Sequence, residues 1–573
     1  MAAKRKPERV SVCIVGAGAS GATAAKVLTE AGVEVVCLDK GPHMRAGDFG
    51  GDELANVNRY YLWPDPILNP RTYRGSAGET PVEKLFCPVP QMVGGGTTHW
   101  TGWVPRFTEG DFNPRTIMGD APGASLADWP IGYADLEPHY DHVEWELGVS
   151  GQAGANAHEA PRRRGYPVPP MPATRYAQLF HDGCARLGYN SYPQPTAMLS
   201  APYRGRRATV QSAFVQQHGD PSGTKSNVLN TFVPDALATG RLDLRPESYV
   251  HEITLDAEGR AKGVVYQDAD GDLIEQEADA VLVGCGAIES ARLLLLSQSG
   301  RFPNGLANGS DQVGRHLTLH EYTAAIGVFD EPVYGWAGGG YVSAASLEFY
   351  AHDESRGFAG GCQIAAAGAG VPLPINFATP GTPVWGAEAK AADRELFNHT
   401  FAVGVLVHDL PQETNRVELD DGVVDAWGRP VARITHRAHP NDLAQARWTV
   451  DRNAEILEAA GAERVWPVYA DRITGNCSHQ HGTARMGDDP ERSVLDAGCR
   501  AHEVENLYVI DGSPFPTGTG INPTLTIMAN AWRVTELVIA RSKRAAEPAR
   551  AGSFRCAAHA SARAAIPNPE ASA

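Results

Sequence analysis

Four residues near the N-terminus have types and a spacing that suit the binding of a dinucleotide. Gly16, Gly18 and Gly21 form a Gly-x-Gly-x-x-Gly pattern, and Asp39 follows about 20 residues further on. The first glycine permits a tight turn, the second lets the backbone approach a pyrophosphate, and the third lets a helix pack closely on a strand. The phosphates would meet backbone N–H groups at the helix N-terminus, where Ser20 is a predicted contact, and Asp39 would bind a ribose. The pattern alone does not distinguish FAD from NAD.

The segments around these glycines have the composition of a strand, a helix and a second strand. Residues 10–15 form a β-branched run typical of buried parallel strands, and an Ala-rich helical stretch follows to residue 31. Gly32 ends that helix, and residues 33–38 form the second strand. Because strand, helix and acid are all in place, a nucleotide site is favoured over a glycine turn without a ligand.

Two later segments repeat the combination of a strand and a glycine turn. Residues 278–283 run into such a turn and a leucine-rich helix, and residues 506–510 end at Asp511-Gly512. A helix of about 15 residues is predicted after Asn522. Nucleotide-binding segments therefore come from the start, the middle and the end of the chain, so the intervening segments must fold as a separate, inserted domain.

The composition is that of a folded, acidic protein. The 573 residues include 50 Lys and Arg against 67 Asp and Glu, a formal charge of −17, and 43% are hydrophobic. These values exclude a disordered or fibrous protein and argue against nucleic acid as the main partner. Nine cysteines without a Cys-x-x-Cys pair favour a reducing compartment over a disulfide framework. Without an apolar run of membrane-spanning length or a signal segment, a cytoplasmic location is expected, although export with a partner subunit stays open.

Five motifs occur in an order that resembles one family of flavoenzymes. They are Gly16-x-Gly18-x-x-Gly21, Gly94-Gly-Gly-Thr-Thr-His99-Trp100-Thr-Gly102, Ala287-Ile-Glu-Ser290, His479-Gln-His481-Gly-Thr-Ala-Arg-Met-Gly487 and Gly520-Ile-Asn522-Pro-Thr-Leu-Thr. From Val10 to Ile539 the chain resembles the glucose-methanol-choline (GMC) family of FAD oxidoreductases. The His479/Asn522 pair and the Thr98-His99-Trp100 block resemble its sugar-oxidising branch: pyranose oxidases, glycoside 3-oxidases, and the large subunits of gluconate and related sugar dehydrogenases.

The resemblance implies an α/β protein in which a Rossmann-like FAD-binding domain carries an inserted, sheet-based substrate domain. The FAD-binding domain would consist of residues 9–112, 205–317 and 468–542, and the substrate domain of residues 113–204 and 318–467. The active site would lie between the two domains. The Ala/Pro/Ser-rich tail, residues 545–573, has no periodicity and is expected to be disordered.

The resemblance also assigns the residues of an alcohol oxidation. His479 matches the position of the family's base, and a neutral imidazole can accept the hydroxyl proton while a hydride leaves carbon for flavin N5. Asn522 matches the group that holds the developing alkoxide, which an amide does without adding a charge. Asn522 would also suit a helix N-cap before Pro523, and His479 a satisfied core histidine. A metal site at His479 and His481 is disfavoured, because no cysteine or carboxylate has the usual spacing.

His99 is a special case among the predicted cofactor contacts. In pyranose oxidases the histidine of the Thr-His-Trp block is bonded to the 8α-methyl group of the flavin. The match at His99 therefore implies either that covalent bond or a non-covalent contact near the dimethylbenzene ring. His316 and His320 resemble a family loop near FAD, for which a supporting or surface role is expected. The other contacts implied by the resemblance are Gly95, Thr97, Thr98, Trp100, Thr101, Val250, Ala287, Asp511, Gly512, Asn522, Pro523 and Thr524.

One departure from the family pattern bears on the fate of the electrons. Large subunits of sugar dehydrogenases often carry a cysteine cluster that resembles a set of iron–sulfur ligands. Here Thr209, Ser212, Val215 and Asp220 stand where the thiolates would be. Threonine and valine cannot bind iron in that role, so electrons are expected to leave the reduced flavin directly to oxygen, a quinone or another soluble acceptor.

These features together predict FAD-dependent oxidation of a secondary hydroxyl group of a sugar or glycoside to a ketone. The alternatives are an oxidase for a non-sugar alcohol and a lyase in which flavin is structural and His479 does acid–base work only. A third alternative is an electron-transfer or binding subunit, which the intact His479/Asn522 pair disfavours. A small partner subunit or a homo-oligomer stays open.

Overall fold

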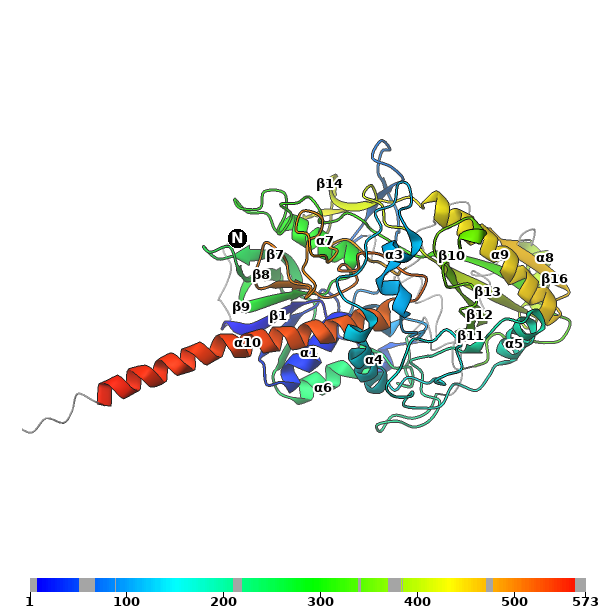
Figure 1. Ribbon diagram of the computed structural model, residues 1–573, viewed down its shortest axis with the longest axis horizontal. Helices are drawn as coiled ribbons and strands as arrows, with labels where there is room; N and C mark the ends of the chain where they lie inside the picture. The colour runs from blue at the N-terminus through cyan, green and yellow to red at the C-terminus, as the bar shows by residue number, and fades with distance from the viewer. Residues whose placement is uncertain are drawn as a thin grey trace, which may run out of the picture.

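The computed structural model describes residues 8–50, 67–87, 89–209, 219–338, 342–368, 383, 385–469 and 478–561. Within these residues the chain forms sheets flanked by helices, with the N-terminal sheet on the left of Figure 1 and a second sheet on the right. The two sheets come from interleaved parts of the chain. This arrangement confirms the predicted α/β class, with a Rossmann-like domain and a separate, sheet-based domain.

The first sheet is mainly parallel at its centre, as the βαβ pattern predicts. Its strand order in the described chain is β6-β2-β1-β9-β8-β7, and β17 also pairs with β9. Val12 lies between Val35 of β2 and Ala280 of β9, and Leu507 of β17 pairs with Val281. The strands are β1 (Val10–Val15), β2 (Val35–Leu38), β6 (Leu242–Arg245), β7 (Tyr249–Leu255), β8 (Ala261–Gln267), β9 (Leu273–Val283) and β17 (Leu507–Val509).

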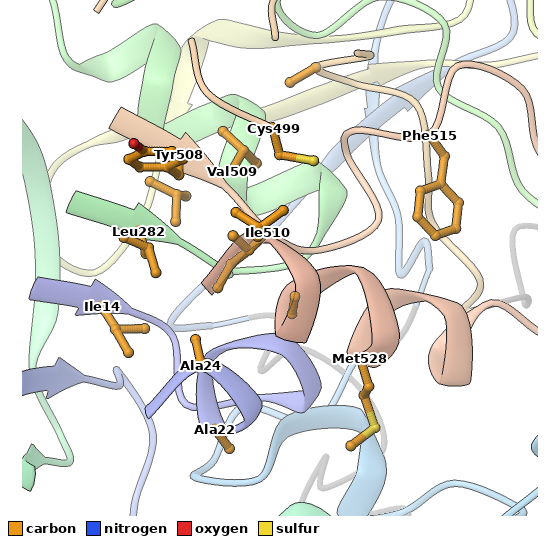
Figure 2. Close-up of a cluster of buried hydrophobic side chains, with 14 of the residues drawn as sticks. Ile14, Ala22, Ala24, Leu282, Cys499, Tyr508, Val509, Ile510, Phe515 and Met528 are labelled. Carbon is orange, nitrogen blue, oxygen red and sulfur yellow. The ribbon is translucent and has the colours of Figure 1, made fainter. Parts of the chain in front are cut away.

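Helices from opposite ends of the chain cover this sheet together. Helix α1 (Ala19–Glu30) follows the glycine turn, and α10 (Thr524–Ser561) lies against it. Figure 2 shows buried side chains at this contact: Ile14 and Leu282 of the sheet lie near Ala24 of α1, and Met528 projects from α10. Alanine and glycine on α1 allow the helix to approach the strands closely, which the third glycine of the motif requires.

The second sheet is antiparallel and forms the inserted domain. Its described strand order is β16-β10-β13-β12-β11-β5, and α5 and α9 pack on one face through residues such as Phe180, Val403 and Leu457. Its strands are β5 (Tyr192–Pro193), β10 (Glu321–Val328), β11 (Val342–Ser346), β12 (Cys362–Gly368), β13 (Thr400–Val407) and β16 (Arg464–Val468). Strand β10 begins directly after His320, so this residue lies where the two domains meet.

A smaller sheet joins segments that the sequence analysis assigned to different domains. Its described order is β14-β15-β3-β4, and Arg433 of β15 pairs with Thr72 of β3. The strands are β3 (Thr72–Arg74), β4 (Val82–Glu83), β14 (Arg416–Val424) and β15 (Pro430–Thr435). Residues 416–435 therefore pair with the predicted FAD-binding segment 9–112, although the sequence analysis placed them in the substrate domain.

The remaining helices connect and cover the sheets. The α-helices are α3 (Pro114–Met118), α4 (Tyr133–Leu147), α5 (Arg175–Leu187), α6 (Phe232–Ala238), α7 (Ala287–Leu296), α8 (Gly386–Leu396) and α9 (Pro440–Ala460). Short 3₁₀ helices are Ala46–Asp48, Gly95–Thr98, Glu109–Phe112, Val228–Asn230 and Glu354–Arg356. In the part of the chain that the structure describes, no helix is long and apolar enough to span a membrane.

The last helix extends further than the sequence analysis predicted. Helix α10 runs from Thr524 to Ser561 and reaches well beyond the rest of the molecule in Figure 1. A helix of about 15 residues was expected from the apolar pattern alone. Residues 545–561 are helical where disorder was predicted; alanine, the strongest helix former, occupies many of these positions, although Pro548 and Gly552 are unfavourable in a helix. Residues 562–573 lie outside the described residues.

Candidate active site and flavin site

A cavity of about 710 Å³ lies at the ends of the central parallel strands of the first sheet. Ligands of open α/β sheets bind at this edge, where the strand order reverses. Most of the residues predicted from the sequence line it. They are Gly16, Gly18, Ser20, Asp39, Gly95, His99, Trp100, Thr101, Val250, Ala287, His479, Asp511, Gly512, Asn522, Pro523 and Thr524. Segments far apart in the sequence are thus brought to one site.

The glycine turn is shaped as a phosphate-binding turn requires. Gly16 has φ +95°, and a Cβ atom there would lie 2.5 Å from the carbonyl oxygen of Gly284. A Cβ atom on Gly21 would lie 1.8 Å from the Gly16 carbonyl oxygen, so Gly21 serves packing and does not line the cavity. Gly18 is the N-cap of α1 and faces Gly95 across the turn. This backbone leaves room for a pyrophosphate at the helix N-terminus.

Two buried aspartates hold the turns at the strand ends. The Asp39 carboxylate accepts hydrogen bonds from the backbone N–H groups of Ala17 (2.8 Å) and Gly41 (2.9 Å). The Asp511 carboxylate accepts one from the N–H of Gly286 at 2.9 Å. Burial raises the pKa of both carboxyl groups. A carboxylate has about four acceptor positions, so Asp39 keeps the capacity to bind ribose hydroxyl groups.

Thr97 and Thr98 do not line the cavity, and their role as cofactor contacts stays a prediction. The Thr97 hydroxyl donates to the Gly94 carbonyl (2.7 Å), and the Thr98 hydroxyl donates to the Gly95 carbonyl (2.8 Å). Both side chains are almost fully buried. In a 3₁₀ turn a threonine hydroxyl reaches the carbonyl three residues back, and this local bond turns both side chains inward. Their hydrogen bonds therefore stabilise the turn that leads to His99 and Trp100.

His99 and Trp100, the next two residues, do face the cavity. His99 is 4% exposed, and its Nδ1 lies 2.8 Å from the Thr98 hydroxyl oxygen. The imidazole ring itself lines the cavity. Trp100 donates from its indole Nε1 to the Ser226 carbonyl at 3.0 Å, which fixes the plane of its ring.

Charged side chains that the sequence analysis did not identify line another part of the cavity. They are Lys40, Arg71, Arg292 and Glu289. Arg71 Nη2 lies 2.9 Å from Glu289 Oε1, and Lys40 Nζ lies 3.7 Å from Glu289 Oε2. Burial opposes the charged form of Glu289, but the three cations outweigh it and hold the pKa of this carboxyl well below its usual range. These residues form no recognisable sequence motif, because only the fold brings their distant segments together.

His479 and Asn522, the predicted catalytic pair, are adjacent at the cavity wall. Asn522 Nδ2 lies 3.2 Å from His479 Nε2, and both residues line the cavity. The amide donates, so Nε2 is the unprotonated nitrogen of the imidazole. Asn522 lies two residues before the start of α10 at Thr524, and its Oδ1 accepts no hydrogen bond within the described residues, so the expected N-cap bond is not formed. Burial lowers the pKa of His479 from 6.5 to about 4, which keeps the ring neutral.

His320 supports this pair through a contact with His479. It is 1% exposed, and its Nδ1 lies 2.8 Å from Nδ1 of His479. Because Nε2 of His479 accepts from Asn522, the His479 proton sits on Nδ1 and is donated to His320. Burial, together with the nearby imidazoles of His479 and His481, holds the pKa of His320 well below 6.5, so it remains a neutral acceptor.

His481 does not line the cavity, and its contacts are with other buried protein groups. Its Nδ1 lies 3.0 Å from the Thr318 hydroxyl, and its ring stacks on Phe515 with centroids 5.7 Å apart. Burial and the neighbouring His479 lower its pKa to about 3. Within the described residues, no group of three or more His, Cys, Asp or Glu side chains is arranged to hold a metal ion.

The burial of His479 predicts the pH dependence of the reaction. A base must be unprotonated to act, so kcat/KM should stay level as the pH falls through 6.5 and should decline only towards about pH 4. Anaerobic flavin reduction measured between pH 4 and 8, with circular dichroism as a check of folding, tests this. An acid limb with a midpoint near 6.5 would show that the ring is not desolvated as described.

A dinucleotide-binding turn and an imidazole–amide pair at one cavity define the class of flavin-dependent oxidoreductases. Family models match the chain over residues 9–46 (FAD binding domain) and over residues 72–322 and 411–531 (GMC oxidoreductase). The chain belongs to the GMC oxidoreductase family. It is an FAD-dependent enzyme that oxidises CH–OH donors as a dehydrogenase or an oxidase, and the glycine cradle at Gly16, Gly18 and Gly95 fits its cofactor.

Individual relatives act on different substrates. The chain is 32% identical to 2-methyl-1,2-propanediol dehydrogenase of Mycolicibacterium austroafricanum, over 93% of this chain and 96% of the relative. It is 29% identical to the gluconate 2-dehydrogenase flavoprotein of Pantoea cypripedii, over 91% and 92%. The solved structure of pyridoxine 4-oxidase from Mesorbium loti shares its fold, with a TM-score of 0.62 at 17% identity over 92% of this chain and 99% of that one.

Proposed function

We propose that this enzyme oxidises a secondary hydroxyl group of a sugar or glycoside to a ketone. The observation that carries the proposal is the contact between Asn522 and the neutral His479 at the wall of the flavin cavity. The Thr98-His99-Trp100 block, which resembles the sugar-oxidising branch, supports a sugar substrate, as does the similarity to the gluconate 2-dehydrogenase flavoprotein.

His479, Asn522 and His320 each have a separate role in the oxidation. Bound FAD supplies the acceptor for the hydride. The substrate hydroxyl group binds between Asn522 Nδ2 and His479 Nε2, and His479 takes its proton while the amide stabilises the developing negative charge on oxygen. The imidazolium formed on His479 keeps its Nδ1–H directed at the neutral His320, which holds the ring in place during the transfer. Burial excludes water from this centre and strengthens each of these interactions.

An anaerobic substrate screen tests the proposal. Sugars and glycosides are mixed with the oxidised holoenzyme without oxygen, and bleaching of the visible flavin band is followed. We expect bleaching with a sugar or glycoside, and a ketone in the product by mass spectrometry. The similarity to 2-methyl-1,2-propanediol dehydrogenase makes a non-sugar alcohol the second candidate, so that diol belongs in the panel. Bleaching by the diol alone would replace our proposal, and turnover without any bleaching would indicate a lyase.

We further propose that electrons leave the reduced flavin directly to a small acceptor. Of the positions where cysteine ligands would stand, Thr209 and Asp220 are described, and Ser212 and Val215 lie outside the described residues. Asp220 accepts hydrogen bonds from the backbone N–H groups of Ser222 (2.8 Å) and Lys225 (2.6 Å), so its carboxylate stabilises its own loop.

Iron analysis and turnover of the purified chain test this electron path. We expect no stoichiometric iron and turnover with a soluble quinone or dye. Since relatives include the flavoprotein of gluconate 2-dehydrogenase and the large subunit of fructose dehydrogenase, a partner subunit is the competing arrangement. Activity that requires an added protein would contradict the proposal.

The linkage of the flavin to His99 is a separate proposal. We infer that His99 is bonded covalently to the 8α-carbon of the flavin, because it occupies the histidine position of the Thr98-His99-Trp100 block and its ring lines the cavity. Acid precipitation should then leave yellow colour in the protein pellet, and His99→Ala should release it. Colour entirely in the supernatant of the unmutated protein would establish the non-covalent alternative.

A further inference from the structure

Lys225 is a fully buried lysine next to the flavin cavity. It has no solvent-exposed surface, and its Nζ donates to the carbonyl oxygens of Thr98 and Trp100, each at 3.1 Å. These carbonyls flank His99, which faces the cavity. Burying an amine costs free energy unless its hydrogen bonds are made. The side chain is thus placed to hold the backbone on both sides of His99.

The residues that follow Lys225 contact the same segment. The Trp100 indole donates to the Ser226 carbonyl at 3.0 Å, and the Val228 N–H donates to the Thr97 hydroxyl oxygen at 3.2 Å. Residues 225–228 are therefore joined to residues 97–100 by both side-chain and main-chain groups. This contact lies behind the cavity wall and leaves the faces of His99 and Trp100 open to the cavity.

The position of Lys225 is itself fixed from the preceding turn. The Asp220 carboxylate accepts from the Lys225 N–H at 2.6 Å and from the Ser222 N–H at 2.8 Å. Asp220 is 5% exposed, so these bonds are made out of solvent. The loop that lacks the cysteine cluster of the sugar dehydrogenases thus ends in a hydrogen-bonded turn that directs Lys225 at the segment facing the cavity.

We propose that Lys225 is a positioning residue that fixes His99 and Trp100 against the flavin. This role rests on the proposed contacts of His99 and Trp100 with the cofactor. Burial lowers the pKa of Lys225 to about 7, against the opposing effect of Asp220. A neutral amine still has two N–H groups, enough for the carbonyls of Thr98 and Trp100. The contact is therefore retained in both protonation states.

The variant Lys225→Met tests the role, because methionine keeps most of the volume and removes both donors. A matched control is Lys26→Met, which removes a lysine that is 3% exposed in α1 and does not line the cavity. We measure the visible circular dichroism of the flavin in the purified holoenzymes, the affinity for FAD of apoprotein made without flavin, before any covalent bond forms, and kcat and KM separately. The first two readouts need no substrate.

We expect Lys225→Met to change the flavin dichroism, weaken FAD binding, and lower kcat roughly 10- to 100-fold with little change in KM, as misplacement of reacting groups does. Lys26→Met should retain the dichroism, FAD affinity and kcat of the unmutated enzyme. Lys225→Gln, which retains a short N–H donor, should fall between methionine and lysine, and it serves alone if the methionine variant does not fold.

Unchanged flavin dichroism and FAD affinity in the folded Lys225 variants would overturn the proposal. Equal changes in Lys26→Met would also overturn it, because they would reflect the loss of any buried lysine. A failure of the proposed function is distinguishable, since it would show as an unmutated enzyme whose flavin is not bleached by any sugar, while the dichroism still reports on Lys225.

Discussion

Replacement of His479 by alanine should lower kcat for the oxidation about 10²–10⁴-fold, the usual contribution of a positioned base. FAD should remain bound, because His479 is only one of many residues that line the cavity. The rate falls because His479 Nε2 is the nitrogen that contacts the amide of Asn522. Among the described histidines, no other ring nitrogen contacts this amide and could replace it as the base. The measurement is the rate of anaerobic flavin reduction by the best substrate.

A control separates this effect from the general loss of a partly buried histidine. His181 lies on α5, on the far side of the second sheet, and its Nδ1 contacts the Ser191 hydroxyl at 2.7 Å. His181→Asn should keep the rate of flavin reduction of the unmutated enzyme. Near-normal reduction in folded, FAD-loaded His479→Ala would remove His479 from the role of base.

The second large effect concerns stability. Glu144 on α4 has no solvent-exposed surface, and its carboxylate lies 2.7 Å from Arg106 Nη2 and 2.5 Å from Arg162 Nη2. Glu144→Gln should lower the free energy of unfolding by about 3–5 kcal/mol, because it leaves both guanidinium groups buried with less negative charge to balance them. Denaturant unfolding of the FAD-loaded protein, followed by protein and flavin signals, gives the value.

The same substitution at an exposed ion pair is the control. Glu34 and Arg241 form a pair whose side chains are 59% and 45% exposed, and Glu34→Gln should cost less than about 1 kcal/mol. Helix α4 is also joined to α10 by a hydrogen bond between the hydroxyl groups of Tyr140 and Thr526, near Asn522. The flavin should therefore lose its native dichroism as the Glu144 variant unfolds. A cost similar to that of Glu34→Gln would contradict the prediction.

The sequence sufficed for the parts of the site that depend on local patterns. The turn at Gly16 and Gly18, the acid at Asp39 and the two strands that carry them are defined within one short segment, where periodicity and glycine chemistry determine the structure. The catalytic pair could be named because each residue lies in a motif that resembles the family. Which atoms of the pair meet could not be inferred from spacing.

The features of the site that the sequence did not reveal depend on contacts between distant segments or on local hydrogen bonding. His320 and His479 are 159 residues apart, and only the docking of the second sheet on the first brings their rings together. Thr97 was predicted to face the cofactor because it lies in the motif, but a bond to a carbonyl three residues back turns its side chain inward. Lys225 gave no sequence signal, because a single lysine is usually exposed.

The strand order of the first sheet has a consequence for how the enzyme is made on the ribosome. Strand β9 emerges before β10 to β16, but β17, which pairs with it, emerges only after all of them. Asp511, Asn522 and α10 follow later still. The nascent chain must therefore expose an unpaired edge of β9 until β17 has emerged, a state that favours aggregation. FAD can be captured fully only after Asn522 has emerged, so a chain that ends before residue 507 should neither load cofactor nor remain soluble.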